Sequence, residues 1–240
     1  MGIWNQMVQR EPWLERDRAM IDQLRTIGIQ KGKAFDPDAR TQELLGAAIQ
    51  EAHAWLDGSY EALFVPFNEG SRWAVPAASE LVKSFESFFQ VPDAYPVDAR
   101  GLAYSFAFFS PKHLGAGQFY LMAIKDRAGN PLDGKATYRL TVPAGAPVNQ
   151  YWSATIYNRQ THTFIRNAPR LGRSSQSPRL QPNDDGSVDI FFGPNAPPGK
   201  DTNWVPTNAD SHFEVLFRFY GPQEPLFDKT WQLPDITKLH

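Results

Sequence analysis

The 240-residue sequence contains no cysteine. This absence excludes disulfide bonds, thiolate nucleophiles, zinc–thiolate sites and iron–sulfur clusters. Neither sign of charge dominates, because 24 lysines and arginines stand against 26 aspartates and glutamates, for a net charge of -2. Without a basic block, the sequence lacks the electrostatic footprint of a nucleic-acid-binding protein. No stretch approaches the roughly 20 apolar residues that a membrane-spanning helix needs, so no span is predicted.

Histidine is scarce, and the five histidines are scattered along the chain: His53, His113, His162, His212 and His240. None forms the close pair that usually marks a metal site on one helix or strand. Gly115-Ala116-Gly117 begins like a dinucleotide-binding fingerprint, but Tyr120 stands where the third glycine is required. We therefore expect neither a metal nor a cofactor.

The first residues, Met-Gly-Ile-Trp-Asn-Gln, lack the charged segment and following apolar run of a signal peptide. We expect no signal peptide in this chain. The compartment stays open: the protein is cytoplasmic, or periplasmic if a signal was removed. The composition, 42% hydrophobic and 21% charged, is that of a globular protein.

Residues 1–92 are predicted to form a helical region that packs on the rest of the chain. Asp36 can cap one helix, with Pro37 at its first position. Apolar residues recur at helical spacing in three segments: 17–29, 37–56 and 77–89. The second helix carries a stripe too apolar to stay in water, which is expected to be buried: Leu45, Ile49 and Trp55.

From residue 93 onward, proline and glycine recur at short intervals, and the runs between them are β-branched and aromatic. Strands are predicted over 119–124, 137–142, 151–157, 161–165, 187–192 and 213–220. The fourth strand is expected to pair with the third as a hairpin, and Asn183 to Gly186 to form a hairpin turn. Short strands without intervening helices indicate an antiparallel sandwich. The predicted fold class is α+β.

Several phrases of the second half stand in the order typical of one bacterial family. They are Leu132-Asp133-Gly134, Tyr138-Arg139-Leu140, Tyr151-Trp152-Ser153-Ala154-Thr155-Ile156-Tyr157, Asp185-Gly186-Ser187-Val188-Asp189, Gly193-Pro194, Gly199-Lys200, Asn203-Trp204-Val205-Pro206-Thr207, Arg218-Phe219-Tyr220-Gly221-Pro222 and Trp231-Gln232-Leu233-Pro234-Asp235-Ile236. From about Leu114 to the C-terminus, the sequence resembles the family catalogued as domain of unknown function 1214.

This resemblance implies a β-sandwich of jelly-roll type over residues 93–240, and it brings no settled activity or catalytic residues. In the family, the domain commonly follows another one, domain of unknown function 1254. The segment from Arg16 to Phe35 is similar to the connection between the two domains. The resemblance therefore implies that this chain lacks the companion domain, as a truncation, a separate gene product or an excised fragment.

The loop over residues 168–182 is rich in arginine. Arg170, Arg173 and Arg179 lie in it, and Arg166 precedes it. Guanidinium groups bind a carboxylate, sulfate or phosphate through paired hydrogen bonds. The alternative is a solvated loop whose arginines pair with nearby acids or with a partner domain.

Aromatic side chains and one histidine complete the candidate site. Aromatic rings can stack on sugars or aromatic ligands, but the cores of sandwiches use the same residues. A histidine beside a tyrosine can supply acid–base chemistry near neutral pH, or it can be a structural, hydrogen-bonded residue. The predicted ligand-binding residues are Trp152, Tyr157, His162, Arg170, Arg173, Ser175 and Trp204; catalytic residues stay unknown.

Two classes of function remain open, and whether the protein is an enzyme is undecided. The first is a ligand-binding or carbohydrate-active protein with an aromatic and arginine-lined site for a small or polymeric anionic substrate. The second is a non-catalytic interaction module that docks a companion domain or associates with itself. Trp204, in a polar loop, either pins that loop to the sandwich or faces a ligand; pinning predicts a cost of about 3–5 kcal/mol for Trp204→Ala.

Overall fold

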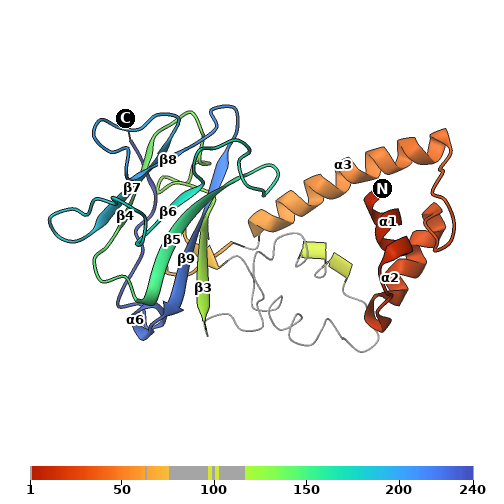
Figure 1. The fold of residues 1–240 in the computed structure, drawn as a ribbon, viewed down its shortest axis with the longest axis horizontal. Coiled ribbons are helices and arrows are strands. Elements are labelled where there is room, and N and C mark those ends of the chain that lie inside the picture. The colour runs from red at the N-terminus through yellow and green to blue at the C-terminus, as the bar shows by residue number, and fades with distance from the viewer. Residues whose placement is uncertain (1, 63, 76–96, 99–100, 103–116, 240) are drawn as a thin grey trace. The chain divides into compact units, whose positions relative to one another are not determined.

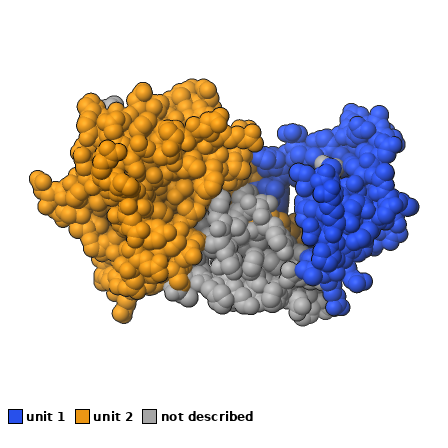
Figure 2. All heavy atoms as spheres, in the orientation of Figure 1, with its two compact units in different colours: residues 1–56 blue, residues 57–240 orange. Residues whose placement is uncertain are grey.

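The computed structural model describes residues 2–62, 64–75, 97–98, 101–102 and 117–239. The chain divides into two compact units, residues 1–56 and 57–240 (Figure 2). The domain boundary predicted at 92/93 and the helix predicted over 77–89 lie outside the described residues.

The first unit consists of short helices and the first part of a long one. Helix α1 spans Gly2–Arg10 and α2 spans Arg18–Gln23, while two 3₁₀ helices span Glu15–Asp17 and Leu24–Ile27. The helix predicted over 17–29 is therefore broken into shorter pieces. The last piece ends at Gly28, whose φ of 88° is in the left-handed region that glycine adopts without steric cost.

Helix α3 spans Ala39–Ala62, and its last turn belongs to the second unit. It begins later than predicted because Asp38, rather than Asp36, accepts a hydrogen bond from the Thr41 backbone N–H at 2.7 Å. This bond lowers the pKa of the Asp38 carboxyl. The helix also continues past its predicted end at Leu56.

The predicted burial of the α3 stripe is wrong for two of its three residues. Ile49 is 48% exposed and Trp55 is 45% exposed, while Leu45 is half-buried. Among the described residues of the first unit, Val8 and Ile29 are the buried hydrophobic ones. Helical spacing shows which face of a helix is apolar, but it does not show whether another element covers that face.

The second unit contains two largely antiparallel sheets (Figure 1). The described strands of the larger sheet, in spatial order, are β1 (Val65–Pro66), β2 (Ala74–Val75), β3 (Gln118–Ala123), β9 (Phe213–Pro222), β5 (Val148–Asn158) and β6 (Gly172–Ser174). Those of the smaller sheet are β10 (Thr237–Lys238), β4 (Tyr138–Val142), β7 (Val188–Gly193) and β8 (Trp204–Pro206). A short helix, α6 (Glu224–Phe227), follows β9. The α+β class is confirmed, although β8 runs parallel to β7.

Alternate residues of the strands form one hydrophobic core to which both sheets contribute. Phe213 of β9 meets the smaller sheet, with its ring centroid 5.6 Å from that of Tyr138 and 6.0 Å from that of Phe192. Because side chains alternate along a strand, the intervening residues of β9 point to the opposite face of the larger sheet. We call this the outer face; it carries Glu214 and Arg218.

The strand predicted over 161–165 is wrong. The chain turns after Asn158, whose carbonyl accepts a hydrogen bond from the His162 backbone N–H at 2.8 Å. His162 has a φ of 51°, which lies in the left-handed region and is incompatible with the extended backbone of a strand. The turn predicted over 183–186 does form, with the Gly186 N–H bonded to the Asn183 carbonyl at 2.9 Å. However, the strands on either side of it, β6 and β7, belong to different sheets.

Candidate functional site

The predicted ligand-binding residues lie in different places. Trp152 belongs to the core and Tyr157 to the outer face. His162 lies in the turn after β5, and Ser175 directly follows β6. The remaining three, Arg170, Arg173 and Trp204, come together where the edge strands β6 and β8 approach each other. We call Arg170, Arg173, Arg179 and Trp204 the arginine junction.

Arg170 is held in place by β8 and the loop before it. Its Nη1 donates hydrogen bonds to the carbonyl oxygens of Asp201 at 2.7 Å and Trp204 at 3.0 Å. The guanidinium carbon lies 5.7 Å from the centroid of the Trp204 ring, within the range of a cation–π contact. These contacts orient the guanidinium without neutralising its charge.

Arg173 is the most unusual residue of the junction. It lies opposite Ala154 in the β5–β6 pair, and its side chain is half-buried. Its Nε is buried and has no hydrogen-bond partner among the described residues. Burial, followed by the charges of Arg170 and Arg179, lowers the pKa of the Arg173 guanidinium. In the described part of the chain, none of these three arginines forms an ion pair with a carboxylate.

The loop that carries Arg179 is hydrogen-bonded to Asn203, the residue before β8. The buried Asn203 side chain accepts a hydrogen bond from the Gln181 backbone N–H at 2.9 Å and donates one to the Gln181 carbonyl at 2.7 Å. Ser175 continues the pairing of β6, because its backbone N–H donates to the Trp152 carbonyl at 3.0 Å. The junction is therefore built on ordered backbone.

Trp152 lies in the core rather than at a ligand site. It is buried and stacks on Phe217, with ring centroids 5.5 Å apart and planes inclined by 19°. Ser175, which is hydrogen-bonded to the backbone of Trp152, is exposed. Its hydroxyl accepts a hydrogen bond from the Trp152 backbone N–H at 3.3 Å. Of these two predicted residues, Ser175 is the one that a ligand can reach.

We expect Trp204→Ala to lower the free energy of unfolding by about 2–3 kcal/mol, less than a fully buried indole would cost. Trp204 is half-buried, and its indole N–H donates to the Gly193 carbonyl at 2.8 Å. Trp204→Phe is the control, because it keeps an aromatic ring and loses the hydrogen bond. Thermal melting measures both variants. A shift of the alanine variant below about one degree would contradict pinning by Trp204.

On the outer face, a polar network joins the end of α3 to the larger sheet. Glu214 is fully buried and accepts a hydrogen bond from the Tyr60 hydroxyl at 3.2 Å. His162 lies between two carboxylates, with Nδ1 at 3.2 Å from Glu214 and Nε2 at 3.6 Å from Asp57. Arg159 pairs with Asp57 in turn. Because both ring nitrogens face carboxylates, His162 has the geometry of a structural histidine.

Tyr157 contacts a residue that the sequence reasoning missed. The Nη2 of Arg218 donates a hydrogen bond to the Tyr157 hydroxyl at 2.5 Å. The sequence signal for this contact was present in two of the family phrases, residues 151–157 and 218–222, in which apolar residues alternate with polar ones. Such alternation places every polar member on one face of the sheet. Glu214 gives a similar signal, as a lone acid in the apolar strand 213–217.

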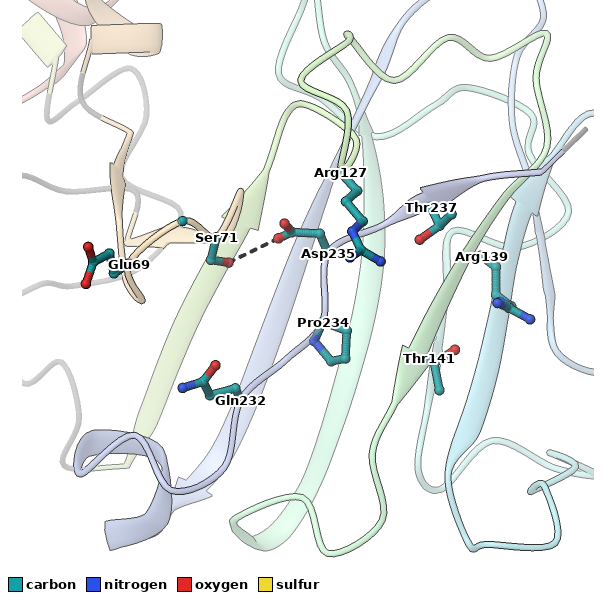
Figure 3. A pocket seen from close by; sticks show the side chains of 10 residues that line it. Glu69, Ser71, Arg127, Arg139, Thr141, Gln232, Pro234, Asp235 and Thr237 are labelled. Atoms are coloured by element: carbon teal, nitrogen blue, oxygen red, sulfur yellow. Dashed lines mark hydrogen bonds between the residues drawn. The ribbon is translucent and has the colours of Figure 1, made fainter.

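A polar pocket of about 440 Å³ lies beside the smaller sheet (Figure 3). The Ser71 hydroxyl donates to Asp235 at 3.1 Å on one side, and Arg127 and Arg139 stand on the other. Its lining residues are Glu69, Gly70, Ser71, Arg127, Arg139, Thr141, Gln232, Pro234, Asp235 and Thr237. The pocket thus carries charges of both signs, and none of the predicted ligand-binding residues lines it.

Within the described ranges, no cluster of three or more histidine, aspartate or glutamate side chains is arranged to hold a metal ion. None of the described helices combines the length and apolarity required to cross a membrane.

The solved structures that are similar to this chain include the following two. The VPA0106 protein from Vibrio parahaemolyticus is 20% identical, with a TM-score of 0.49, and the match covers 94% of this chain and 51% of that protein. An uncharacterized protein from Burkholderia cenocepacia is 21% identical, with a TM-score of 0.35, and the match covers 67% and 48% of the two chains. This chain thus spans about half the length of either protein. No curated protein matches it.

The strands of the arginine junction and of the outer face lie within one segment that matches a known family. The match extends from residue 117 to residue 224, which includes β3 to β9. It confirms the resemblance carried by the sequence phrases. Residues 117–224 of this chain therefore match the model of the family described as protein of unknown function (DUF1214).

Proposed function

We propose that this protein binds an anionic ligand, of the acidic saccharide class, at the arginine junction. The observation that carries the proposal is the half-buried Arg173, whose buried Nε has no acceptor among the described residues. A buried polar group without a partner is costly, and a partly buried charge without a counter-charge is more so. A bound carboxylate or sulfate would supply both the acceptor and the charge.

The surroundings of Arg173 support an anion rather than a neutral ligand. Arg170 adds a second guanidinium, which backbone carbonyls orient, and its charge repels that of Arg173. Like charges held close together without a counter-ion are unfavourable, so an anion between them would relieve the repulsion. The exposed hydroxyl of Ser175 lies close by in the chain and can bind a sugar hydroxyl.

Trp204 has a positioning role in this proposal, because the Arg170 guanidinium lies over its ring.

We also propose that the second unit has the fold of a jelly-roll sandwich, which the hydrophobic core shared by the two sheets supports. The edge strands β6 and β8 come from different sheets, so the junction lies at a side of that sandwich. Because Ser175 and Arg179 are exposed there, the junction is accessible to a polymeric ligand as well as a small one.

We expect Arg173→Met to weaken binding of trigalacturonate at least about tenfold, as the loss of a charge-assisted hydrogen bond implies. Titration calorimetry on the full chain measures the dissociation constant, with maltotriose as the neutral saccharide. Arg166→Met is the matched control, since Arg166 is exposed and close in sequence. Equal affinities for the two variants, or no binding of trigalacturonate and sulfate by the unsubstituted protein, would contradict the proposal.

A second candidate function, an interaction module, is favoured by the surface of the first unit. Large hydrophobic side chains are exposed there in greater number than they are buried, and exposed apolar groups of this kind mark interaction sites. They are Ile3, Trp4, Met7, Leu14, Met20, Leu44, Ile49 and Trp55. The ligand of this module would be a companion domain or a second copy of the chain.

If the chain associates with itself through α1, the double variant Ile3→Ser, Trp4→Ser should stay monomeric at concentrations at which the unsubstituted chain associates. Sedimentation velocity from about 1 to about 200 μM measures the association. Gln6→Ser is the control, as an exposed polar residue of the same helix. A monomeric unsubstituted chain over the whole range would leave a companion domain as the partner to test.

A further inference from the structure

The outer face of the larger sheet carries an ordered array of polar residues across three neighbouring strands. One row across β3, β9 and β5 consists of Gln118, Tyr220 and Tyr151; the next consists of Tyr120, Arg218 and Ser153. Residues that are paired across strands have side chains on the same face. The two rows therefore form one continuous patch, which we call the tyrosine patch.

Arg218 stands at the centre of the tyrosine patch. It is half-buried and donates hydrogen bonds to the hydroxyls of Thr155 at 3.0 Å and Tyr157 at 2.5 Å. Its guanidinium carbon lies 5.7 Å from the ring centroid of Tyr120 and 5.9 Å from that of Tyr157. Among the residues that the structure describes, no carboxylate forms an ion pair with Arg218.

The tyrosines around Arg218 do not provide the missing negative charge. Burial raises the pKa of the Tyr120 hydroxyl. Burial, followed by the hydrogen bond with Tyr151, raises the pKa of Tyr220 to about 12. Both groups are therefore neutral at physiological pH. The guanidinium thus lies in a partly desolvated setting of hydroxyls and aromatic rings.

The neighbouring row offers a pair of aromatic rings. Tyr151 and Tyr220 are half-buried and stacked, with centroids 4.1 Å apart and planes inclined by 17°. Tyr220 and Arg218 are two residues apart on β9, which corresponds to about 7 Å along a strand. A ring in contact with the tyrosine pair can therefore carry an anionic substituent that reaches the guanidinium.

We propose that the tyrosine patch is a binding site for a small carboxylate carried on a ring. The carboxylate pairs with Arg218, and the ring packs against Tyr151 and Tyr220. This site is separate from the arginine junction. Arg173 shares its face with the core residue Ala154, whereas its neighbour Ser174 pairs with Ser153 and lies on the outer face. Either proposal can fail while the other stands.

Titrations of the full chain with 4-hydroxybenzoate and glucuronate test the tyrosine patch and distinguish an aromatic ring from a sugar ring. At least one is expected to bind, with the uncharged partners 4-hydroxybenzamide and methyl glucoside at least about tenfold weaker. This comparison needs no variant and so does not depend on folding. Failure of both carboxylates to bind at about 10 mM, or equal binding of the uncharged partners, would overturn the proposal.

Variants then locate the site. Arg218→Met is expected to abolish the preference for the carboxylate, whereas Arg173→Met leaves it unchanged. Arg218→Lys keeps the charge and is expected to retain part of the affinity, which covers the case of a methionine variant that does not fold. Tyr220→Ala is expected to weaken binding of the preferred ring. Unchanged binding in both Arg218→Lys and Tyr220→Ala would place the carboxylate elsewhere and overturn the assignment.

Discussion

Glu214→Ala is expected to lower the free energy of unfolding by about 3–5 kcal/mol, because two side chains lose a buried hydrogen-bond acceptor at a cost of about 1–3 kcal/mol each. Glu214 is 0% exposed, and its carboxylate meets the Tyr60 hydroxyl and the His162 ring. Without it, the buried Tyr60 hydroxyl and the largely buried His162 ring each lose this acceptor. Denaturation with urea measures the loss.

The matched control for this prediction is Glu224→Ala, since Glu224 is an exposed glutamate in α6. Surface substitutions of this kind usually change stability by less than about 0.5 kcal/mol. Glu214→Gln keeps the shape of the side chain and is expected to fall between the two. Equal midpoints for the Glu214→Ala and Glu224→Ala variants would show that the polar network does not hold α3 to the sheet.

Phe217→Ala is expected to cost a similar amount, about 3–5 kcal/mol, by emptying a site at the centre of the core. Phe217 is fully buried and contacts three aromatic rings. Its ring centroid lies 5.5 Å from that of Trp152, 6.1 Å from Trp73 and 4.9 Å from Phe219. The cavity would be lined by rigid rings, which collapse poorly around a void.

Phe227→Ala makes the same chemical change at a position that is 43% exposed, so it separates burial from the loss of a phenyl group. We expect its cost to be well under half that of the Phe217 variant. The two variants are compared by thermal and urea unfolding of the full chain. Comparable losses of stability would contradict the assignment of Phe217 to the centre of the core.

Strand positions could be predicted from the sequence because alternation is a local property. In residues 213–220, the core-facing residues of β9 alternate with residues that are polar except for Leu216. The end of α3 could not be predicted, because Gly58 suggests a stop. Instead, the helix continues to Ala62, and the buried Tyr60 near its end donates a hydrogen bond to Glu214, far away in sequence. Tertiary contacts override local propensity at such ends.

The candidate sites were predictable in part. The spacing of arginines indicated an anion site, and the structure brings Arg170 and Arg173 together with Trp204. The sequence could not show that Trp152 faces the core, because an aromatic residue suits either face of a strand. The sequence did not indicate Arg218 as a candidate binding residue, because it lies in an apolar run. The tyrosines around it are brought there by the pairing of β9 with β3 and β5.

The most direct test of the arginine junction follows the buried Nε–H of Arg173 itself. Arginine side chains labelled with nitrogen-15 give one Nε–H resonance per residue, which responds to a new acceptor at that nitrogen. Titration with trigalacturonate should shift the Arg173 resonance until it saturates, while the resonance of the exposed Arg166 stays in place. An Arg173 resonance that does not move, or that drifts without saturation as Arg166 does, would contradict anion binding at the junction.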